Sequence, residues 1–184
     1  MKVLILNGGP KKNGATAKVT EIISEQLSKK QIVKYICLGD KIINYCFGCK
    51  ACHINGECCQ EDDIVSIVQS ILSADVVLTV VPSYWAEVPG QMKVFIDRCT
   101  PYSNTNPNRI EILHKTLGYT IALRTGPNPA ECEGIIKSIN HYYGHMEIEQ
   151  KGSAYFCGVN DKEDIDKQRD SIVSLCEEWF DKFD

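Results

Sequence analysis

The hydrophobic and polar positions of the chain follow two alternating patterns. Short, nearly continuous apolar runs are typical of strands buried on both faces, whereas apolar residues three or four positions apart are typical of amphipathic helices. The first pattern predicts strands at residues 3–6, 31–38, 74–81, 117–123 and 146–156, the last of them irregular around Gly152. The second predicts helices after Thr16, from Asp62 to 72, from Pro89 to about 98, around 135–143, and at 161–183.

This regular alternation of strands and helices predicts an α/β protein with a parallel sheet and helices on both faces. Five strands fit the flavodoxin-like order 2-1-3-4-5, a three-layer α/β/α sandwich in which ligands bind beyond the carboxyl ends of the strands. No repeat, linker or low-complexity tract divides the 184 residues. We therefore expect a single domain, residues 1–184, with a cysteine-rich insertion at about 44–60.

Composition and charge narrow the range of functions. The chain is 43% hydrophobic and 24% charged, an ordinary globular composition, and its formal net charge is −4. It has no basic run, so we expect no nucleic-acid partner. No apolar run approaches the ~20 residues that span a bilayer, and the N-terminus lacks a signal-peptide pattern. We therefore expect a cytoplasmic protein without a membrane contact.

The loop after the first strand has the features of an anion site. Residues 7–10, Asn-Gly-Gly-Pro, form a turn, and the next helix begins near Thr16. Free backbone N–H groups at a helix start bind anions, and Lys11, Lys12 and Thr16 add donors suited to a phosphate. The loop matches neither a Walker A motif nor a Gly-x-Gly-x-x-Gly fingerprint. A plain strand–helix connection with spare glycines is the alternative.

Two further loops at the same sheet edge complete a candidate ligand site. Pro82-Ser83-Tyr84-Trp85 places two aromatic rings at the end of the central strand, and Thr125-Gly126 offers small residues and open backbone at the next strand end. A phosphate, a flat ring and ring edges that need hydrogen bonds together describe FMN, which carries its own redox chemistry. A packed corner formed by Tyr84 and Trp85 is the alternative.

Five of the ten cysteines lie between residues 46 and 59. Four of them form a C-x2-C-x2-C-x5-C array: Cys46, Cys49, Cys52 and Cys58. A cubane iron–sulfur cluster requires four thiolates, which this array supplies. We favour Cys58 over Cys59 as the fourth ligand because its spacing matches, and we expect His53 to be exposed. Zinc, a disulfide within the loop and reduced thiols remain alternatives. The other five cysteines stand among apolar residues, and we expect them to be small buried side chains: Cys37, Cys99, Cys132, Cys157 and Cys176.

These motifs resemble those of the NAD(P)H-dependent FMN reductase family of flavodoxin-like proteins, and within it the iron–sulfur flavoproteins. The resemblance covers Lys2 to about Phe156. It rests on residues 7–16, on the cysteine array followed by Glu-Asp-Asp, and on residues 82–85 together with 90–98. Together with the loops described above, it implies these FMN contacts: Gly9, Pro10, Lys11, Asn13, Ala15, Thr16, Pro82, Ser83, Tyr84, Trp85, Thr125 and Gly126.

The loop at residues 7–16, which we call the phosphate loop, departs from the family pattern at three positions. The family usually has Ser where Gly9 stands, Arg where Lys11 stands, and Asn or Ser where Ala15 stands. Each change removes side-chain hydrogen bonds to phosphate, and Lys is a poorer bidentate partner than Arg. Backbone amides and Thr16 remain, so we expect FMN to bind, with more of the phosphate contacts made by the backbone and by Lys11 or Lys12.

The expected activity is that of an oxidoreductase that takes electrons from NAD(P)H through FMN to a quinone, a free flavin or another small-molecule acceptor. Tyr84 and Trp85 would border the ring, and no catalytic side chain is expected because hydride transfer needs no general acid or base. The second hypothesis is an iron–sulfur flavoprotein electron carrier with a [4Fe–4S] cluster on the array and a redox protein partner. The third is a non-enzymatic module with zinc-binding or redox-sensing cysteines.

The expected assembly comes from the same resemblance. Reductases of this kind are commonly dimers or tetramers in which a neighbouring chain covers the flavin, so we expect a homodimer or homotetramer. Three aromatic residues that we expect to be exposed near the site, Tyr84, Trp85 and Tyr102, fit a protein partner. A loop packed on itself would look the same in the sequence.

Overall fold

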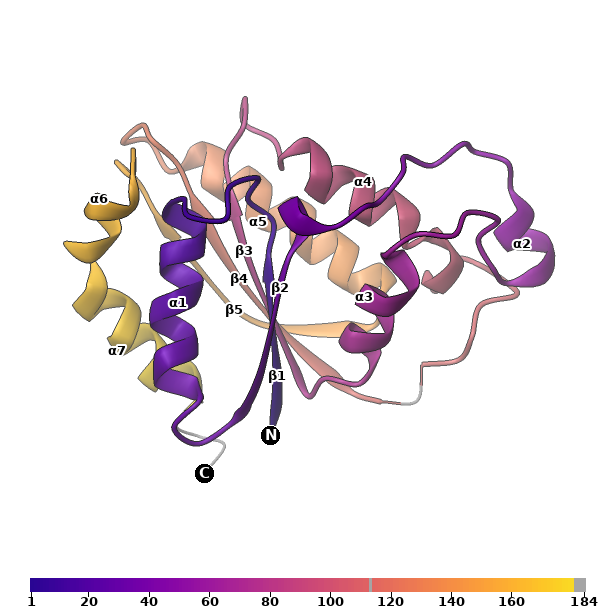
Figure 1. Cartoon of the computed structure of the whole chain (residues 1–184), viewed down its shortest axis with the longest axis horizontal. Coiled ribbons are helices and arrows are strands. Elements are labelled where there is room, and N and C mark those ends of the chain that lie inside the picture. Colours follow the sequence, from indigo (N-terminus) through magenta and orange to yellow (C-terminus); the bar gives the residue numbers. More distant parts are fainter. Residues whose placement is uncertain (113, 181–184) are drawn as a thin grey trace.

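A parallel five-stranded sheet forms the centre of the molecule (Figure 1). The computed structural model describes residues 1–112 and 114–180. The strands are β1 (Lys2–Asn7), β2 (Ile32–Cys37), β3 (Val76–Pro82), β4 (Thr116–Leu123) and β5 (Ile148–Phe156). Their order is β2-β1-β3-β4-β5 and every neighbouring pair is parallel. The predicted α/β fold with strand order 2-1-3-4-5 is therefore confirmed.

Helices cover both faces of this sheet (Figure 1). One face carries α1 (Ala15–Leu27), α6 (Lys162–Asp166) and α7 (Arg169–Phe180). The other carries α3 (Ile64–Leu72), α4 (Gly90–Arg98) and α5 (Ala130–His145). The remaining elements are α2 (Ala51–Asn55) and two 3₁₀ segments, η1 (Leu38–Asp40) and η2 (Thr100–Tyr102). Among the described residues, no helix is long and apolar enough to cross a membrane.

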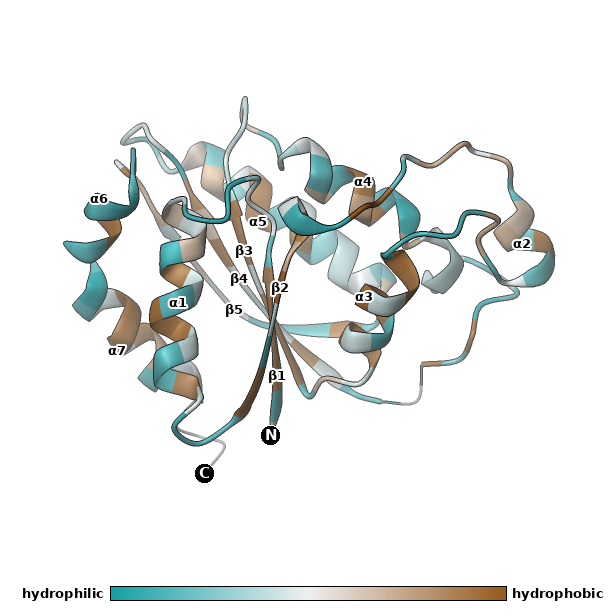
Figure 2. Ribbon diagram, in the orientation of Figure 1, coloured by the Kyte–Doolittle hydropathy of each residue, from teal (hydrophilic) through white to brown (hydrophobic). Residues whose placement is uncertain are grey.

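Alternating residues of the central strands supply two separate cores. In β1, Val3 and Ile5 pack with α1 and α7, whereas Leu4 and Leu6 pack with α3 and α4. This division follows from the strand geometry, because successive side chains point to opposite faces of a sheet. Both faces are covered, so β1 and β3 are apolar almost throughout, and Figure 2 shows the hydrophobic residues of α3 and of the central strands.

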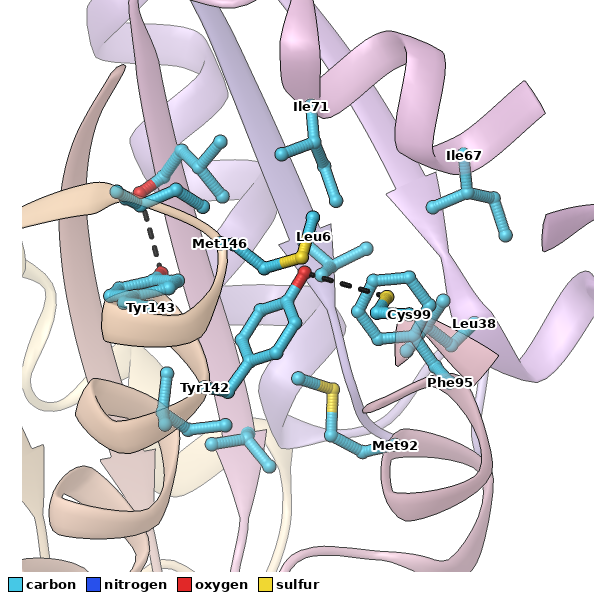
Figure 3. Close-up of a cluster of buried hydrophobic side chains, with 14 of the residues drawn as sticks. Leu6, Leu38, Ile67, Ile71, Met92, Phe95, Cys99, Tyr142, Tyr143 and Met146 are labelled. Atoms are coloured by element: carbon cyan, nitrogen blue, oxygen red, sulfur yellow. Dashed lines mark hydrogen bonds between the residues drawn. The ribbon is translucent and has the colours of Figure 1, made fainter. Parts of the chain in front are cut away.

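Two tyrosines of α5 carry the polar atoms of the core between the sheet and α4 (Figure 3). The Tyr143 hydroxyl lies 2.8 Å from Thr79 Oγ1 and 2.9 Å from the Tyr119 carbonyl, which joins α5 to β3 and β4. The Tyr142 hydroxyl accepts a hydrogen bond from the Cys99 thiol at 3.8 Å. Burial raises the pKa of Tyr143 to about 12 and that of Cys99 to about 12. Both groups therefore stay neutral and serve packing.

One predicted element is wrong. The sequence predicts a single helix at 161–183, whereas the chain forms α6 and α7 with a break at residues 167–168. Asp161 starts α6 because its side chain accepts a hydrogen bond from the Asp164 N–H at 3.1 Å. The break allows both Ile165 and Ile172 to reach the core against α1 and the sheet. Phe183, which we placed on the apolar face of that helix, lies outside the described residues.

Two predicted loops contain short helical turns. The cysteine-rich segment at 44–60 includes α2, and the loop at 100–109 begins with η2. Tyr102 of η2 is half-buried rather than exposed, and burial raises the pKa of its phenol. Of the five cysteines outside residues 46–59, Cys157 is half-buried and the others are buried. The predicted irregularity near Gly152 is present as a register shift between β4 and β5.

Candidate functional site

A cleft of about 320 Å³ opens at the carboxyl edge of the sheet, which is the volume of a small ligand pocket. It brings together the ends of β1, β3 and β4, which are far apart in the sequence. The predicted contact residues that line it are Pro10, Lys11, Asn13, Ala15, Thr16, Pro82, Ser83, Tyr84 and Thr125. Most of the predicted FMN contacts therefore line a single cavity. That these residues contact FMN stays a prediction.

Three residues of the predicted set do not line this cleft. Gly9 is buried beneath it, and its N–H donates to Asn7 Oδ1 at 2.8 Å. Gly126 lies just outside the cleft, and its carbonyl accepts from the Gly158 N–H at 3.2 Å. Trp85 is 98% exposed at the tip of a tight turn, with a positive φ of 56°. The turn points this ring into solvent rather than into the cleft.

The packing of Thr16 explains the glycine at position 9. A Cβ atom added to Gly9 would lie 2.2 Å from Thr16 Oγ1 and 3.1 Å from Asn7 Oδ1. Contacts below 3 Å are not tolerated, so the Thr16 hydroxyl occupies the space that a serine at position 9 would need. This helix residue is itself buried and lines the cleft.

The start of α1 forms the polar end of the cleft. Gly14 is the N-cap residue of α1, and it has no side chain to bond the first N–H groups of the helix. The Lys18 N–H donates to the Gly14 carbonyl at 3.0 Å. The backbone N–H groups of residues 15–17 thus form the open end of the helix, where the helix dipole favours an anion. Lys12 turns away and pairs with Asp40 at 3.0 Å, so Lys11 is the lysine of this loop that lines the cleft.

Arg124 is a cleft residue that the sequence reasoning missed. Its Nη2 pairs with Glu131 Oε1 at 3.0 Å, and Ser83 Oγ donates to Glu131 Oε2 at 2.7 Å. Among the described residues, Arg124 Nε is buried without a hydrogen-bond partner. A buried donor of this kind needs a partner, and a ligand in the cleft could supply one. In the sequence, the one indication of this role was that Arg124 directly precedes Thr125, a predicted contact.

The connection from β5 to α6 was also missed. Residues 159–163 line the cleft together with residues 10–11 and 13–16. They bring Lys162 together with the acidic Asp161 and Glu163, so the basic groups Lys11, Arg124 and Lys162 share the cleft with two carboxylates. A larger open groove of about 720 Å³ continues from this end along α1.

The four thiols of the cysteine array and that of Cys59 surround a second, much smaller cavity. Its volume is about 30 Å³, the share of a single water molecule in the liquid. The cavity is lined by Cys46, Cys49, Cys52, Cys58 and Cys59, together with Arg98 at the end of α4. His53 lies on α2 and is exposed, as expected. Figure 1 shows α2 and the segments beside it extending beyond α3 and α4, at the opposite end of the molecule from α1 and α6.

One pair of these thiols is in direct contact. Cys49 Sγ and Cys59 Sγ are 3.5 Å apart. Hydrogen bonds from the Ala51 backbone N–H and from the Cys59 thiol lower the pKa of Cys49, and the bond to Cys49 raises the pKa of Cys59. Burial raises the pKa of Cys52. Of the two thiols in contact, Cys49 is therefore the one that ionises more readily.

A buried ion pair holds the array against the body of the protein. The Arg98 side chain is 1% exposed, and its Nη1 lies 2.6 Å from Asp62 Oδ2 and 2.6 Å from the Asn44 carbonyl. Its Nη2 donates to Cys58 Sγ at 3.4 Å. Burial alone would raise the pKa of Asp62, but bonds from Arg98 and from the N–H groups of Asn44 and Ile64 lower it. Both ends of the cysteine segment are thereby fixed to α4.

The thiols around this cavity are the ligand type that both zinc sites and iron–sulfur clusters use. Within residues 1–112 and 114–180, no group of three or more His, Cys, Asp or Glu side chains is arranged to hold a metal ion. A zinc site needs four ligands that converge on one point, whereas each thiolate of a cubane cluster binds a different iron. Cys46, Cys49 and Cys59 are exposed, and Cys52 and Cys58 are half-buried.

Comparison with known proteins gives both sites a context. The model of the NADPH-dependent FMN reductase family matches residues 1–129. An iron–sulfur flavoprotein of Archaeoglobus fulgidus is 30% identical over 149 residues, 80% of this chain and 66% of that protein. An iron–sulfur flavoprotein of Methanocaldococcus jannaschii is 29% identical over 161 residues, 87% of this chain and 79% of that protein. The chain thus spans just under two thirds of the archaeal relative named first.

The fold has close counterparts among solved structures. One is an FMN-dependent NADH-azoreductase of Bacillus anthracis, solved in complex with FMN. It superimposes with a TM-score of 0.70 at 15% sequence identity, over 97% of this chain and 99% of the azoreductase chain. At this low identity the likeness establishes the shared fold alone.

Proposed function

The chain belongs to the NADPH-dependent FMN reductase family, and on that premise we propose that it is an FMN-dependent oxidoreductase that carries electrons from NAD(P)H to a small acceptor. The observation that carries the proposal is the cleft, where the loops after β1, β3 and β4 meet at the edge at which such sheets bind ligands. When bound, FMN supplies the redox chemistry by accepting electrons from the nicotinamide and releasing them to the acceptor.

The protein's own residues would bind and orient the cofactor. The open N-terminus of α1, Thr16 and Lys11 suit a phosphate, because N–H groups, a hydroxyl and an ammonium all donate to phosphate oxygens. Tyr84 at the other wall offers an aromatic face to a flat ring. Arg124 Nε supplies a buried donor whose partner is missing among the described residues. No acid or base is needed for hydride transfer, and we assign none.

A matched pair of variants tests this assignment. Lys11→Ala combined with Thr16→Val removes two donors from the cleft, each worth about 1.5–3 kcal/mol if the bond is charge-assisted. FMN affinity should fall by about one to two orders of magnitude per bond. Lys12→Ala is the control, because Lys12 pairs with Asp40 outside the cleft. Equal FMN dissociation constants for all three proteins, measured by flavin fluorescence, would remove this loop from the cofactor site.

We propose as a second candidate that the protein also carries a [4Fe–4S] cluster and exchanges electrons with a redox protein. The convergence of five thiols on one cavity favours this, and the names of the archaeal relatives support it. Cys46, Cys49, Cys52 and Cys58 would be the ligands, as their spacing suggests.

Iron and sulfide analysis after anaerobic purification tests the second candidate. We expect roughly four irons and four sulfides per chain, the content of one cubane cluster. Cys58→Ser should lower this content, and Cys157→Ser, outside the array, should not. If the chain holds no iron but oxidises NAD(P)H, the second candidate is wrong and the protein is a reductase that uses FMN alone. Zinc, or a reversible loop disulfide without turnover, would instead support a non-enzymatic module.

We further propose that the flavin site is completed by a second copy of the chain, in a homodimer or homotetramer. Trp85 at the cleft edge is 98% exposed and Tyr84 is 45% exposed, which suits a covering chain. Light scattering of the FMN-loaded protein should report an oligomer. A monomer at every concentration would contradict this assembly.

A further inference from the structure

Two histidines of α5 form a cluster that neither the cleft nor the cysteine cavity uses. His141 and His145 lie one turn apart near the C-terminal end of the helix, and their Nε2 atoms are 3.2 Å from each other. Their ring planes are nearly perpendicular, at 88°. Two imidazole nitrogens at this distance can share either a proton or a metal ion.

Asn104 determines which nitrogen of His145 carries the proton. Asn104 Nδ2 donates to the Gly144 carbonyl at 3.2 Å, so its Oδ1 is the atom that faces His145 Nδ1, at 3.1 Å. An amide oxygen can only accept, so this closer contact favours a proton on His145 Nδ1 and a free lone pair on Nε2, while the Ser103 hydroxyl, which can either donate or accept, lies 3.5 Å from Nδ1. Metal-binding histidines are oriented in the same way, by a hydrogen bond from the ring nitrogen that does not bind the metal.

The spacing of the two Nε2 atoms already matches a shared ion. Two nitrogens bound tetrahedrally to zinc at about 2.0–2.1 Å are about 3.3–3.4 Å apart. The observed separation of 3.2 Å is close to this value, and the rings must turn so that both lone pairs point at the ion. His145 lies in the last turn of α5, where the helix dipole favours a bound cation.

We propose that His141 and His145 form a surface site for one divalent transition-metal ion of the zinc type. Both Nε2 atoms bind the ion and water fills its other positions. Without metal, His141 Nε2–H donates to His145 Nε2; on binding, that proton moves to His141 Nδ1, so both imidazoles stay neutral. Magnesium and calcium do not suit the site, because they prefer oxygen ligands.

Equilibrium dialysis against Zn²⁺ with metal analysis tests the site. The wild-type chain is compared with His141→Ala, with His145→Ala and with His114→Ala. His114 is an exposed histidine paired with Asp75, so it is the control. Cysteines contribute equally to all four proteins. We expect each α5 variant to bind one zinc ion fewer than the wild type and the control, with unchanged circular dichroism. Equal zinc contents in all four would overturn the proposal.

Histidine-selective ¹⁵N NMR gives an independent readout. On zinc addition, the ring signals of His141 and His145 should shift together, and those of His114 should stay in place. Asn104→Ala should weaken zinc binding by about 10–100-fold, the usual effect of removing a residue that orients a ligand. If His141 and His145 shift only at zinc concentrations that also shift His114, the ion is adventitious and the proposal fails.

Discussion

Replacement of Arg98 by methionine should destabilise the protein far more than the same change elsewhere on α4. The Arg98 side chain is 1% exposed, as is that of Asp62, and two of its nitrogens bond the carboxylate at 2.6 and 3.2 Å. Methionine replaces the aliphatic part of the arginine side chain but not its guanidinium, so the main effect of Arg98→Met is to leave Asp62 buried without its countercharge.

The expected magnitude follows from that burial. Breaking a buried ion pair by removing one partner costs about 3–5 kcal/mol. Two further acceptors, the Asn44 carbonyl and Cys58 Sγ, also lose their donor. For a domain of this size, such a loss lowers the melting temperature by about 6–20 °C. The cysteine segment, tied to Arg98 at both ends, should loosen with it.

Urea unfolding followed by circular dichroism measures the effect, and Lys93→Met is the matched control. Lys93 pairs with Asp97 on the same helix at 2.6 Å, but the two side chains are 60% and 44% exposed. Exposed pairs contribute about 0.2–1 kcal/mol. Equal losses for the two variants would show that the Asp62–Arg98 pair does not hold this part of the fold.

The same pair sets a pH dependence. Because the folded pKa of Asp62 is lowered, its contribution is present above the carboxyl's usual pKa of about 4 and is lost as the pH falls below it. The stability difference between the wild type and Arg98→Met should therefore shrink toward about pH 3. A difference that stays constant from neutral to acid pH would contradict the assigned role of Asp62.

Three further changes test the packing. Gly9→Ser should cost about 1–3 kcal/mol of unfolding free energy, because its Cβ would lie 2.2 Å from Thr16 Oγ1. Adding Thr16→Ala should restore most of the loss in urea unfolding; no restoration would refute the clash. Gly118→Ala should destabilise by a similar amount, since its Cβ would lie 2.6 Å from the Tyr143 ring, whereas Gly144→Ala, with open space, should not. Tyr143→Phe should cost about 1–3 kcal/mol and, because the folded pKa is about 12, should reduce the loss of stability above about pH 10. An unchanged alkaline stability profile would contradict this.

The sheet could be predicted from the sequence because its central strands are buried on both faces. The run at 3–6 is apolar throughout, the run at 74–81 is apolar except for Asp75 and Thr79, and the two form β1 and β3 as expected. The break between α6 and α7 has no comparable signal, because no glycine or proline marks residues 167–168. It depends on how Ile165 and Ile172 pack against α1, which is a tertiary contact.

Residues of the candidate site could be predicted where they stand at the end of a strand. They could not be predicted where tertiary packing brings them to the cleft. Tyr84 and Thr125 follow buried strands directly, so their position at the sheet edge could be read from the pattern. The residues at 159–163 reach the cleft only because β5 lies beside β4. The orientation of Trp85 depends on a left-handed turn, which a tryptophan in the sequence does not indicate.

The central claim is that this cleft binds FMN for reduction by a nicotinamide. The most direct measurement is the visible spectrum of the FMN-loaded protein, freed of unbound flavin by gel filtration and then titrated anaerobically with NADPH and, separately, with NADH. We predict one FMN retained per chain and loss of its visible absorption with at least one of the two donors. A protein that retains no FMN, or whose bound FMN neither donor reduces, would contradict the account.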